Sequence, residues 1–96
     1  MVNYIIRVTY ADIQPDTYDK LNAELAKYNV AGAIKADDGK GYLLPLGEYC
    51  YSGNEPINEV RDAIHRLAAT LHPEPSILVV EVSTLAWSGL KLIDGV

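Results

Sequence analysis

Hydrophobic positions recur at two spacings along the first half of the chain, and each change of spacing marks a new predicted element. In residues 4–10 the even-numbered positions are apolar or aromatic and the odd-numbered positions more polar, which is the period of a strand covered on one face. From Thr17 to Tyr28 apolar residues stand three and four apart, which predicts a helix with Tyr18 and Tyr28 in the core. Residues 30–36 read as a short strand weakened by a glycine.

The second half of the chain shows the same order of patterns. After a polar turn at 37–41, the segment 42–52 is extended, and alternation is regular only from 47 to 52 because Pro45 interrupts it. An apolar stripe from Ile57 to Leu71 predicts a second helix that begins after Pro56. Residues 77–84 form the last core strand, and its first half is apolar on both faces, which is typical of a central strand. Residues 85–96 are a tail, in which 90–93 have the composition of a short fifth strand.

The order strand, helix, strand, strand, helix, strand predicts an α+β fold, a ferredoxin-like β-α-β-β-α-β two-layer sandwich with a C-terminal tail. Right-handed crossovers place both helices on one face of the sheet. The other face is then open, and we expect Arg7, Thr9 and Glu81 to lie on it. The length of 96 residues predicts a single domain over residues 1–96.

Composition narrows the classes of partner. The net charge is −5 and the basic residues are scattered, so we expect no double-stranded DNA partner. The longest apolar run, 77–80, is too short for a membrane span, and the first residues do not resemble a signal peptide. The single cysteine, Cys50, allows no internal disulfide, and together these features predict a cytoplasmic protein.

Residues with reactive side chains form no motif for a cofactor or a metal ion. Asp37 and Asp38 precede a glycine and indicate a hairpin turn rather than a cation loop. His65 and His72 stand seven apart on the predicted second helix, about 10 Å along its axis, which is too far to share an ion. Cys50 has no neighbouring base, so we interpret it as a packing residue.

Aromatic residues provide the candidate contact sites. Tyr49 and Tyr51 share a strand face and, with Arg7, are candidates for contact with RNA bases, although packing against a helix is the simpler interpretation. The single tryptophan lies in the tail, beyond the predicted core, where large aromatic residues often anchor a partner. The candidate partner-binding residues are Trp87, Leu90 and Leu92. The alternative for Trp87 is packing onto its own domain.

Several segments resemble two families of small ferredoxin-like endoribonucleases. The opening strand Tyr4–Val8, the strand 78–82 and the segment 86–90 resemble the CRISPR adaptation nucleases and their shorter relatives. The acidic turn 36–39 and the segment 57–61 look similar to the type V antitoxin endoribonucleases, the GhoS family. The resemblance covers the chain from about Tyr4 to Leu90. It implies a homodimer and an activity on single-stranded RNA.

The chain departs from the CRISPR-associated pattern at the end of the first strand. That family has a metal-binding aspartate where this chain has Thr9, and a hydroxyl is a weaker ligand than a carboxylate for a hard cation. Asp12 lies three residues further on and is a weak catalytic candidate, provided that the connection bends back. Dimerisation could persist without the metal.

Two functions therefore remain open at the level of sequence. The first is an interaction or regulatory domain, homodimeric through the open sheet edge or face and the tail around Trp87, and degenerate with respect to the nucleases. The alternative is an endoribonuclease that acts on single-stranded RNA, as the antitoxin resemblance implies. Neither function requires a cofactor, and the sequence does not decide whether the chain is an enzyme.

Overall fold

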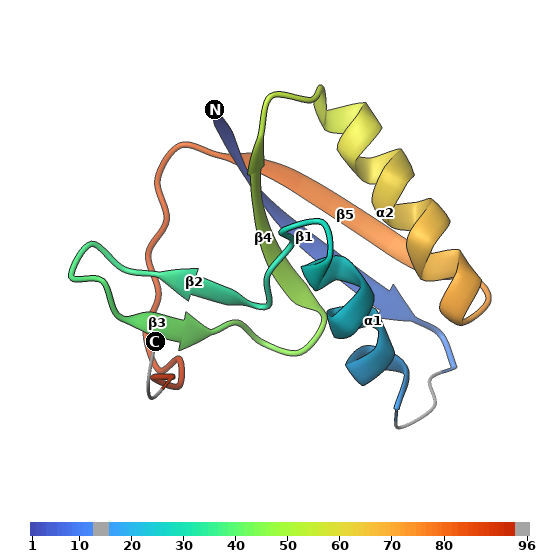
Figure 1. Ribbon diagram of the computed structural model, residues 1–96, viewed down its shortest axis with the longest axis horizontal. Helices are drawn as coiled ribbons and strands as arrows, with labels where there is room; N and C mark the ends of the chain where they lie inside the picture. The colour runs from blue at the N-terminus through green and yellow to red at the C-terminus, as the bar shows by residue number, and fades with distance from the viewer. Residues whose placement is uncertain (13–15, 94–96) are drawn as a thin grey trace.

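A computed structural model describes residues 1–12 and 16–93 of the chain and contains seven helices and strands among them (Figure 1). In chain order these are β1 (Val2–Tyr10), α1 (Thr17–Ala26), β2 (Ala33–Lys35), β3 (Gly41–Leu43), β4 (Glu48–Gly53), α2 (Ile57–Leu71) and β5 (Pro75–Val82). The predicted α+β class and the order of the elements are confirmed.

The main sheet has the strand order β4-β1-β5, and β1 is antiparallel to both neighbours. Ala31 forms an isolated antiparallel bridge with Cys50 of β4, so the chain after α1 reaches the place of the fourth strand of a ferredoxin-like sheet. It then leaves the sheet as the β2-β3 hairpin, which extends away from the two helices in Figure 1. The predicted strand 30–36 is thus divided into a bridge and a short hairpin strand.

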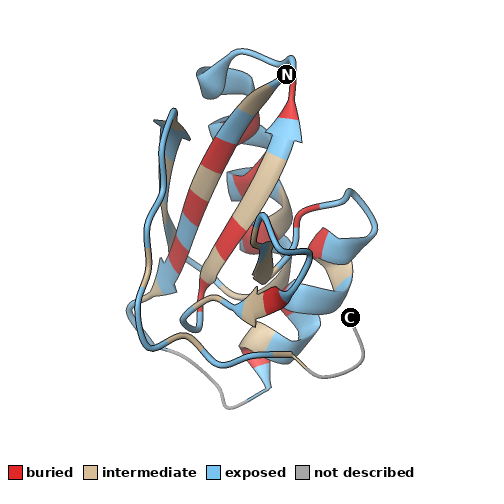
Figure 2. Ribbon diagram, turned by 90° about the vertical axis from the view of Figure 1, so that its left-hand side faces the viewer, coloured by how far each residue is buried: buried red, intermediate tan, exposed pale blue. Residues whose placement is uncertain are grey.

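Both helices lie on one face of the main sheet, and the core fills the space between the two layers. Along β1 buried and exposed residues alternate, as Figure 2 shows, because successive side chains of a strand point to opposite faces. The buried apolar residues are Tyr4, Ile6, Val8, Leu21, Leu25, Val30, Tyr49, Val60, Ile64 and Ala68. The assignment of the even-numbered positions of β1 to the covered face is therefore confirmed.

Tyrosine hydroxyls connect the two layers. The Tyr4 hydroxyl donates to the carbonyl oxygen of Glu55, just before α2, at 2.6 Å. The Tyr10 hydroxyl, at the other end of β1, donates to the carbonyl oxygen of Ala68 in α2 at 2.9 Å. Each bond satisfies a hydroxyl that would otherwise lose its water partner on burial. One strand thus holds α2 near both of its ends.

A second pair of tyrosines holds α1. The Tyr18 hydroxyl donates to the carbonyl oxygen of Val8 at 3.1 Å, and the Tyr49 hydroxyl of β4 donates to Oδ1 of Asn22 at 2.5 Å. Tyr49 is 1% exposed, so its hydroxyl has no access to bulk water and depends on this partner. The helix layer is therefore aligned on the sheet by directional bonds as well as by apolar contact.

Three expectations are wrong, two about side chains and one about the position of a strand in the sheet. Tyr28 is 61% exposed rather than in the core, because α1 ends at Ala26 and Asn29 turns the chain with a φ of 62°. Glu81 does not lie on the open face, since it pairs with Tyr4 across β1 and cross-strand partners point to the same side. The strand β5 is not central, because it forms the edge of the sheet.

The close approach of the loop before β4 to β1 provides a stability test. Gly47 has a φ of +85°, and a Cβ atom there would lie 2.6 Å from the carbonyl oxygen of Val8. Gly39 has the same φ, but nothing lies within 4 Å of its Cβ position. We expect Gly39→Ala to cost about 1 kcal/mol of unfolding free energy from backbone strain. We expect Gly47→Ala to cost about 1–3 kcal/mol more, because overpacking adds to the strain.

Urea denaturation of the two alanine variants and of the wild-type protein measures this difference. Gly39→Ala is the matched control because it carries the strain of positive φ without the clash. Equal losses of stability in the two variants would contradict the close approach of Gly47 to β1.

Candidate functional site

The face of the sheet opposite the helices carries exposed apolar side chains. In β5, Leu78 is 58% exposed and Val80 is 47% exposed. Their cross-strand partners in β1 are Arg7 and Ile5, which point to the same side. Isolated apolar residues on a surface are ordinary, but these two are neighbours on one strand face. Together Ile5, Leu78 and Val80 form an apolar patch that we call the open-face patch.

The outer edge of β5 is also free. The strand is eight residues long and lies at the end of the β4-β1-β5 order, and no other strand within residues 1–12 and 16–93 pairs with that edge. An edge strand presents unpaired backbone N–H and C=O groups, to which a further strand can bind. Natural proteins often protect such an edge with charges, but β5 has only Glu81 among its eight residues. The open-face patch and the free edge therefore adjoin each other.

The tail after β5 folds back onto its own chain. The backbone N–H of Leu43 donates to the carbonyl oxygen of Lys91 at 2.9 Å, and Leu92 forms a bridge with Tyr42 of β3. The rings of Trp87 and Tyr42 lie 5.6 Å apart between centroids. The segment predicted as a short fifth strand is thus a single bridge to the hairpin. Of the candidate partner-binding residues, Trp87 and Leu90 are half-buried and Leu92 is 44% exposed.

The tail encloses a cleft of about 540 Å³ against the sheet. Its walls come from β2, from the start of β1 and from the tail itself, including Lys35, Asn3 and Trp87. Cys50 also lines it, and its thiol donates to the carbonyl oxygen of Ala33 at 2.9 Å. Burial raises the pKa of the Cys50 thiol, which disfavours the reactive thiolate. The packing interpretation of Cys50 agrees with this environment.

The three candidate RNA-contact residues do not form one surface. Tyr49 and Tyr51 share a face, as expected, but it is the face covered by the helices, since they pair with Ile6 and Tyr4 of β1. Arg7 points to the opposite side of the sheet. A nucleic-acid base cannot stack on Tyr49, which is 1% exposed. Of the three candidates, Arg7 is exposed and Tyr51 is half-buried, so contact of Tyr49 with RNA bases is the part of the prediction that the burial does not fit.

Tyr51 makes a polar contact instead. Its hydroxyl donates to a carboxylate oxygen of Glu55, and the backbone N–H of Asn54 donates to the other oxygen. The hydrogen bond to Glu55 raises the pKa of Tyr51, and the same bond lowers the pKa of Glu55. Both shifts favour a neutral tyrosine beside an ionised glutamate. Glu55 therefore carries a negative charge at neutral pH at the beginning of α2.

The residues at the end of β1 do not fit the metal site that the nuclease resemblance implies. Thr9 is exposed and pairs across the sheet with Ser76, so two hydroxyls stand where a carboxylate would be needed. Asp12 is exposed beyond the end of the strand. Within the described part of the chain, no group of three or more His, Cys, Asp or Glu side chains is arranged to hold a metal ion. We therefore derive no metal-dependent step from these residues.

The open-face patch is the feature that sequence reasoning missed. Alternation in residues 77–82 does place Leu78 and Val80 on one side, but the interpretation of β5 as a central strand concealed their exposure. The number of charged residues in a strand cannot decide whether it lies at an edge. That assignment depends on which strands pair, and pairing is a property of the whole chain.

Comparison with known proteins gives no relatives, because no family model, curated protein or solved structure matches this chain. Among the described residues, no helix is both long enough and apolar enough to cross a membrane. The functional argument therefore rests on the geometry of the chain itself.

Tyrosine ionisation tests how tightly the aromatic residues are held. The pKa values of Tyr4, Tyr10 and Tyr49 are raised mainly by burial, and that of Tyr51 mainly by its bond to Glu55. Unfolded tyrosines lose their protons near pH 10. Above that pH the unfolded state binds fewer protons than the folded state, so the free energy of unfolding falls as pH rises.

We expect the phenolate absorbance to rise in two stages between pH 9 and about 13. The second stage should be cooperative and should coincide with the loss of the near-ultraviolet circular dichroism signal. The control is the same titration in denaturant, where all seven tyrosines ionise together. A single non-cooperative stage near pH 10 with the fold intact would show that the tyrosines are not held as described.

Proposed function

We propose that this chain is an interaction domain that self-associates through β5, with the β5 strand of a second copy added antiparallel at the free edge. The observation that carries the proposal is the exposure of Leu78 and Val80 on an eight-residue edge strand. Strand addition supplies backbone hydrogen bonds for affinity, and alternate side chains supply specificity. A two-fold axis through such a pair uses the same surface on both copies.

One register of the two strands fits the side chains best. If the axis passes through Val79, then Leu78 of each copy lies opposite Val80 of the other. Four exposed apolar side chains then meet on the open face. In the same register Glu81 lies opposite Ile77, which separates the two carboxylates instead of placing like charges face to face. Hydrophobic contact and charge thus favour one alignment.

The tail is not part of this proposed interface. Its backbone groups already bond to β3, and Trp87 already contacts Tyr42. We therefore place the homodimer contact at β5 rather than at Trp87, Leu90 and Leu92. The combined sheet would have six strands, with all four helices on one face and a continuous open face on the other.

Charge substitutions on β5 test the proposal. We expect the wild-type protein to have the mass of a dimer in sedimentation equilibrium at high micromolar concentration. We expect Leu78→Glu and Val80→Lys to be monomers, because each variant places a charged side chain against an apolar side chain of the other copy. Leu46→Lys is the control for a new surface charge, since Leu46 is 72% exposed in the loop before β4, and we expect it to remain a dimer.

The double variant with both β5 substitutions tests the register. In an alignment centred on Val79, the new glutamate of each copy lies opposite the new lysine of the other, which makes two charge pairs, so the double variant should dimerise again. A wild-type protein that stays monomeric up to about 1 mM would overturn the proposal. A dissociation constant of 1 mM corresponds to a binding free energy of only about −4 kcal/mol. Dimers that persist in both single variants would also overturn it. Specific cleavage of single-stranded RNA by a wild-type monomer would favour the endoribonuclease instead.

A further inference from the structure

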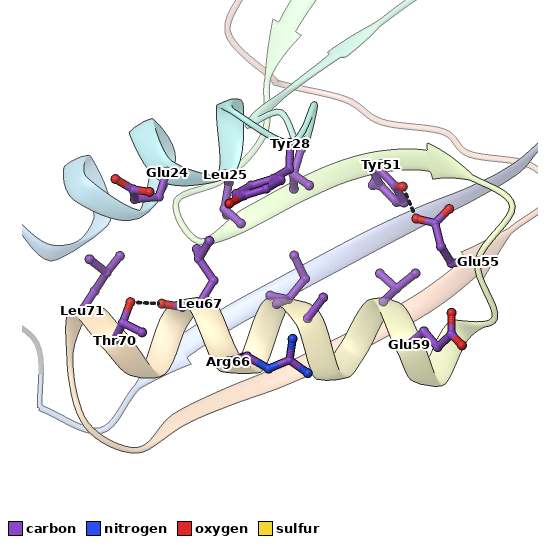
Figure 3. Close-up of a pocket in the computed structure, with 14 residues that line it drawn as sticks. Glu24, Leu25, Tyr28, Tyr51, Glu55, Glu59, Arg66, Leu67, Thr70 and Leu71 are labelled. Atoms are coloured by element: carbon purple, nitrogen blue, oxygen red, sulfur yellow. Dashed lines mark hydrogen bonds between the residues drawn. The ribbon is translucent and has the colours of Figure 1, made fainter.

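A groove of about 860 Å³ lies between α1 and α2, on the side of the sheet away from the open-face patch (Figure 3). It exists because α1 has ten residues and α2 has fifteen, so the shorter helix leaves part of the longer one without a neighbour. Buried side chains of Leu25, Val30 and Ile64 form its floor. The groove is independent of the proposed dimer, because α2 separates it from the outer edge of β5.

The walls of the groove are apolar and accessible. Tyr28, which is 61% exposed, stands on the α1 side, and Leu67 and Ala63 stand on the α2 side. A tyrosine held in the open beside an apolar floor is a common feature of interaction sites, because its ring buries a large area at a small loss of conformational entropy. The walls thus offer contacts that the two helices of this chain leave unused.

Charge around the groove is unbalanced. Its lining contains three carboxylates, of Glu24, Glu55 and Glu59, and one guanidinium, of Arg66. Lys27 pairs with Glu24 at 3.0 Å, whereas Glu59 forms no ion pair with any residue in the described part of the chain. Figure 3 shows Glu55 and Glu59 together at one end of the groove and Glu24 toward the other. A basic partner therefore complements this surface and an acidic one does not.

We propose that the groove binds an amphipathic α-helix of a partner protein, with basic residues beside its apolar stripe. The fifteen residues of α2 make it about 22 Å long, which matches a partner helix of about four turns. Leucine-like side chains at helical spacing enter between Tyr28 and Leu67, as in other helix-in-groove complexes. Lysine or arginine side chains flanking them reach Glu55 and Glu59, and the groove thereby receives a third helix on the sheet.

The probe for this site is a 16-residue synthetic peptide with leucines at i, i+3, i+4 and i+7 and lysines flanking them. Its control is the same peptide with every lysine replaced by glutamate. We expect the basic peptide to bind the protein of residues 1–96, measured by isothermal titration, and to shift the amide resonances of Ala63 and Leu67. Binding of the acidic peptide with equal affinity, or no binding of the basic peptide at millimolar protein, would overturn the proposal.

Substitutions in α2 locate the peptide. Ala63→Trp fills the groove, and we expect it to weaken binding at least tenfold, whereas Ala69→Trp places the same side chain on α2 outside the lining and should leave affinity unchanged. Glu59→Lys should weaken binding about fivefold, as expected for an exposed charge pair. Glu74→Lys makes the same charge change outside the groove and should have no effect beyond that of net charge.

The outcome for the groove can be separated from the outcome for the dimer. Leu78→Glu alters only the open face, so a monomeric Leu78→Glu variant should bind the basic peptide as the wild-type protein does. Full affinity in Ala63→Trp, or equal losses in Ala63→Trp and Ala69→Trp, would show that the peptide does not lie in the groove.

Discussion

The hydrogen bonds of the core tyrosines are the interaction on which the remaining architecture depends. The chain contains seven tyrosines and no phenylalanine, and four of the hydroxyls join the helix layer to the sheet. Each aromatic ring contributes apolar burial, while its hydroxyl needs a partner at a fixed place. Tyr4 and Tyr10 determine where α2 lies along β1, and Tyr18 and Tyr49 do the same for α1. A core of phenylalanines would bury similar area without specifying these positions.

Two surfaces follow from this alignment of the helices. Because both helices are held on one face, the other face of the sheet remains open along β5, where Leu78 and Val80 are exposed. Because α1 is shorter than α2, the helix layer is incomplete and leaves the groove between them. The tail closes only the part of the open face near the hairpin, through its bonds to β3. The proposed self-association and the proposed helix binding therefore use opposite sides of the main sheet.

The local patterns in the sequence predicted the elements well, and pairing between distant segments was the part they could not predict. Alternation in β1 and helical spacing in α2 correctly identified the covered faces, because each depends only on neighbouring residues. Glu81 was placed on the wrong face, and β5 in the wrong position of the sheet, because both depend on the register between β1 and β5. Tyr28 was misplaced because periodicity continues beyond the residue at which α1 ends. For the candidate site, the sequence identified Trp87 in the tail as a candidate contact residue, but it could not show that Trp87 contacts Tyr42.

Amide hydrogen exchange as a function of protein concentration tests self-association through β5 most directly. Among the eight residues of β5, the backbone N–H groups that face the free edge should exchange more slowly as concentration rises, because a second strand then covers them. The amides of Leu43 and Ile93, which bond within the chain, serve as the internal reference and should not change. Concentration-dependent protection confined to alternate residues of β5 is the result the account predicts. Exchange in β5 that is fast and independent of concentration, in a protein shown to be dimeric, would contradict it and place the interface elsewhere.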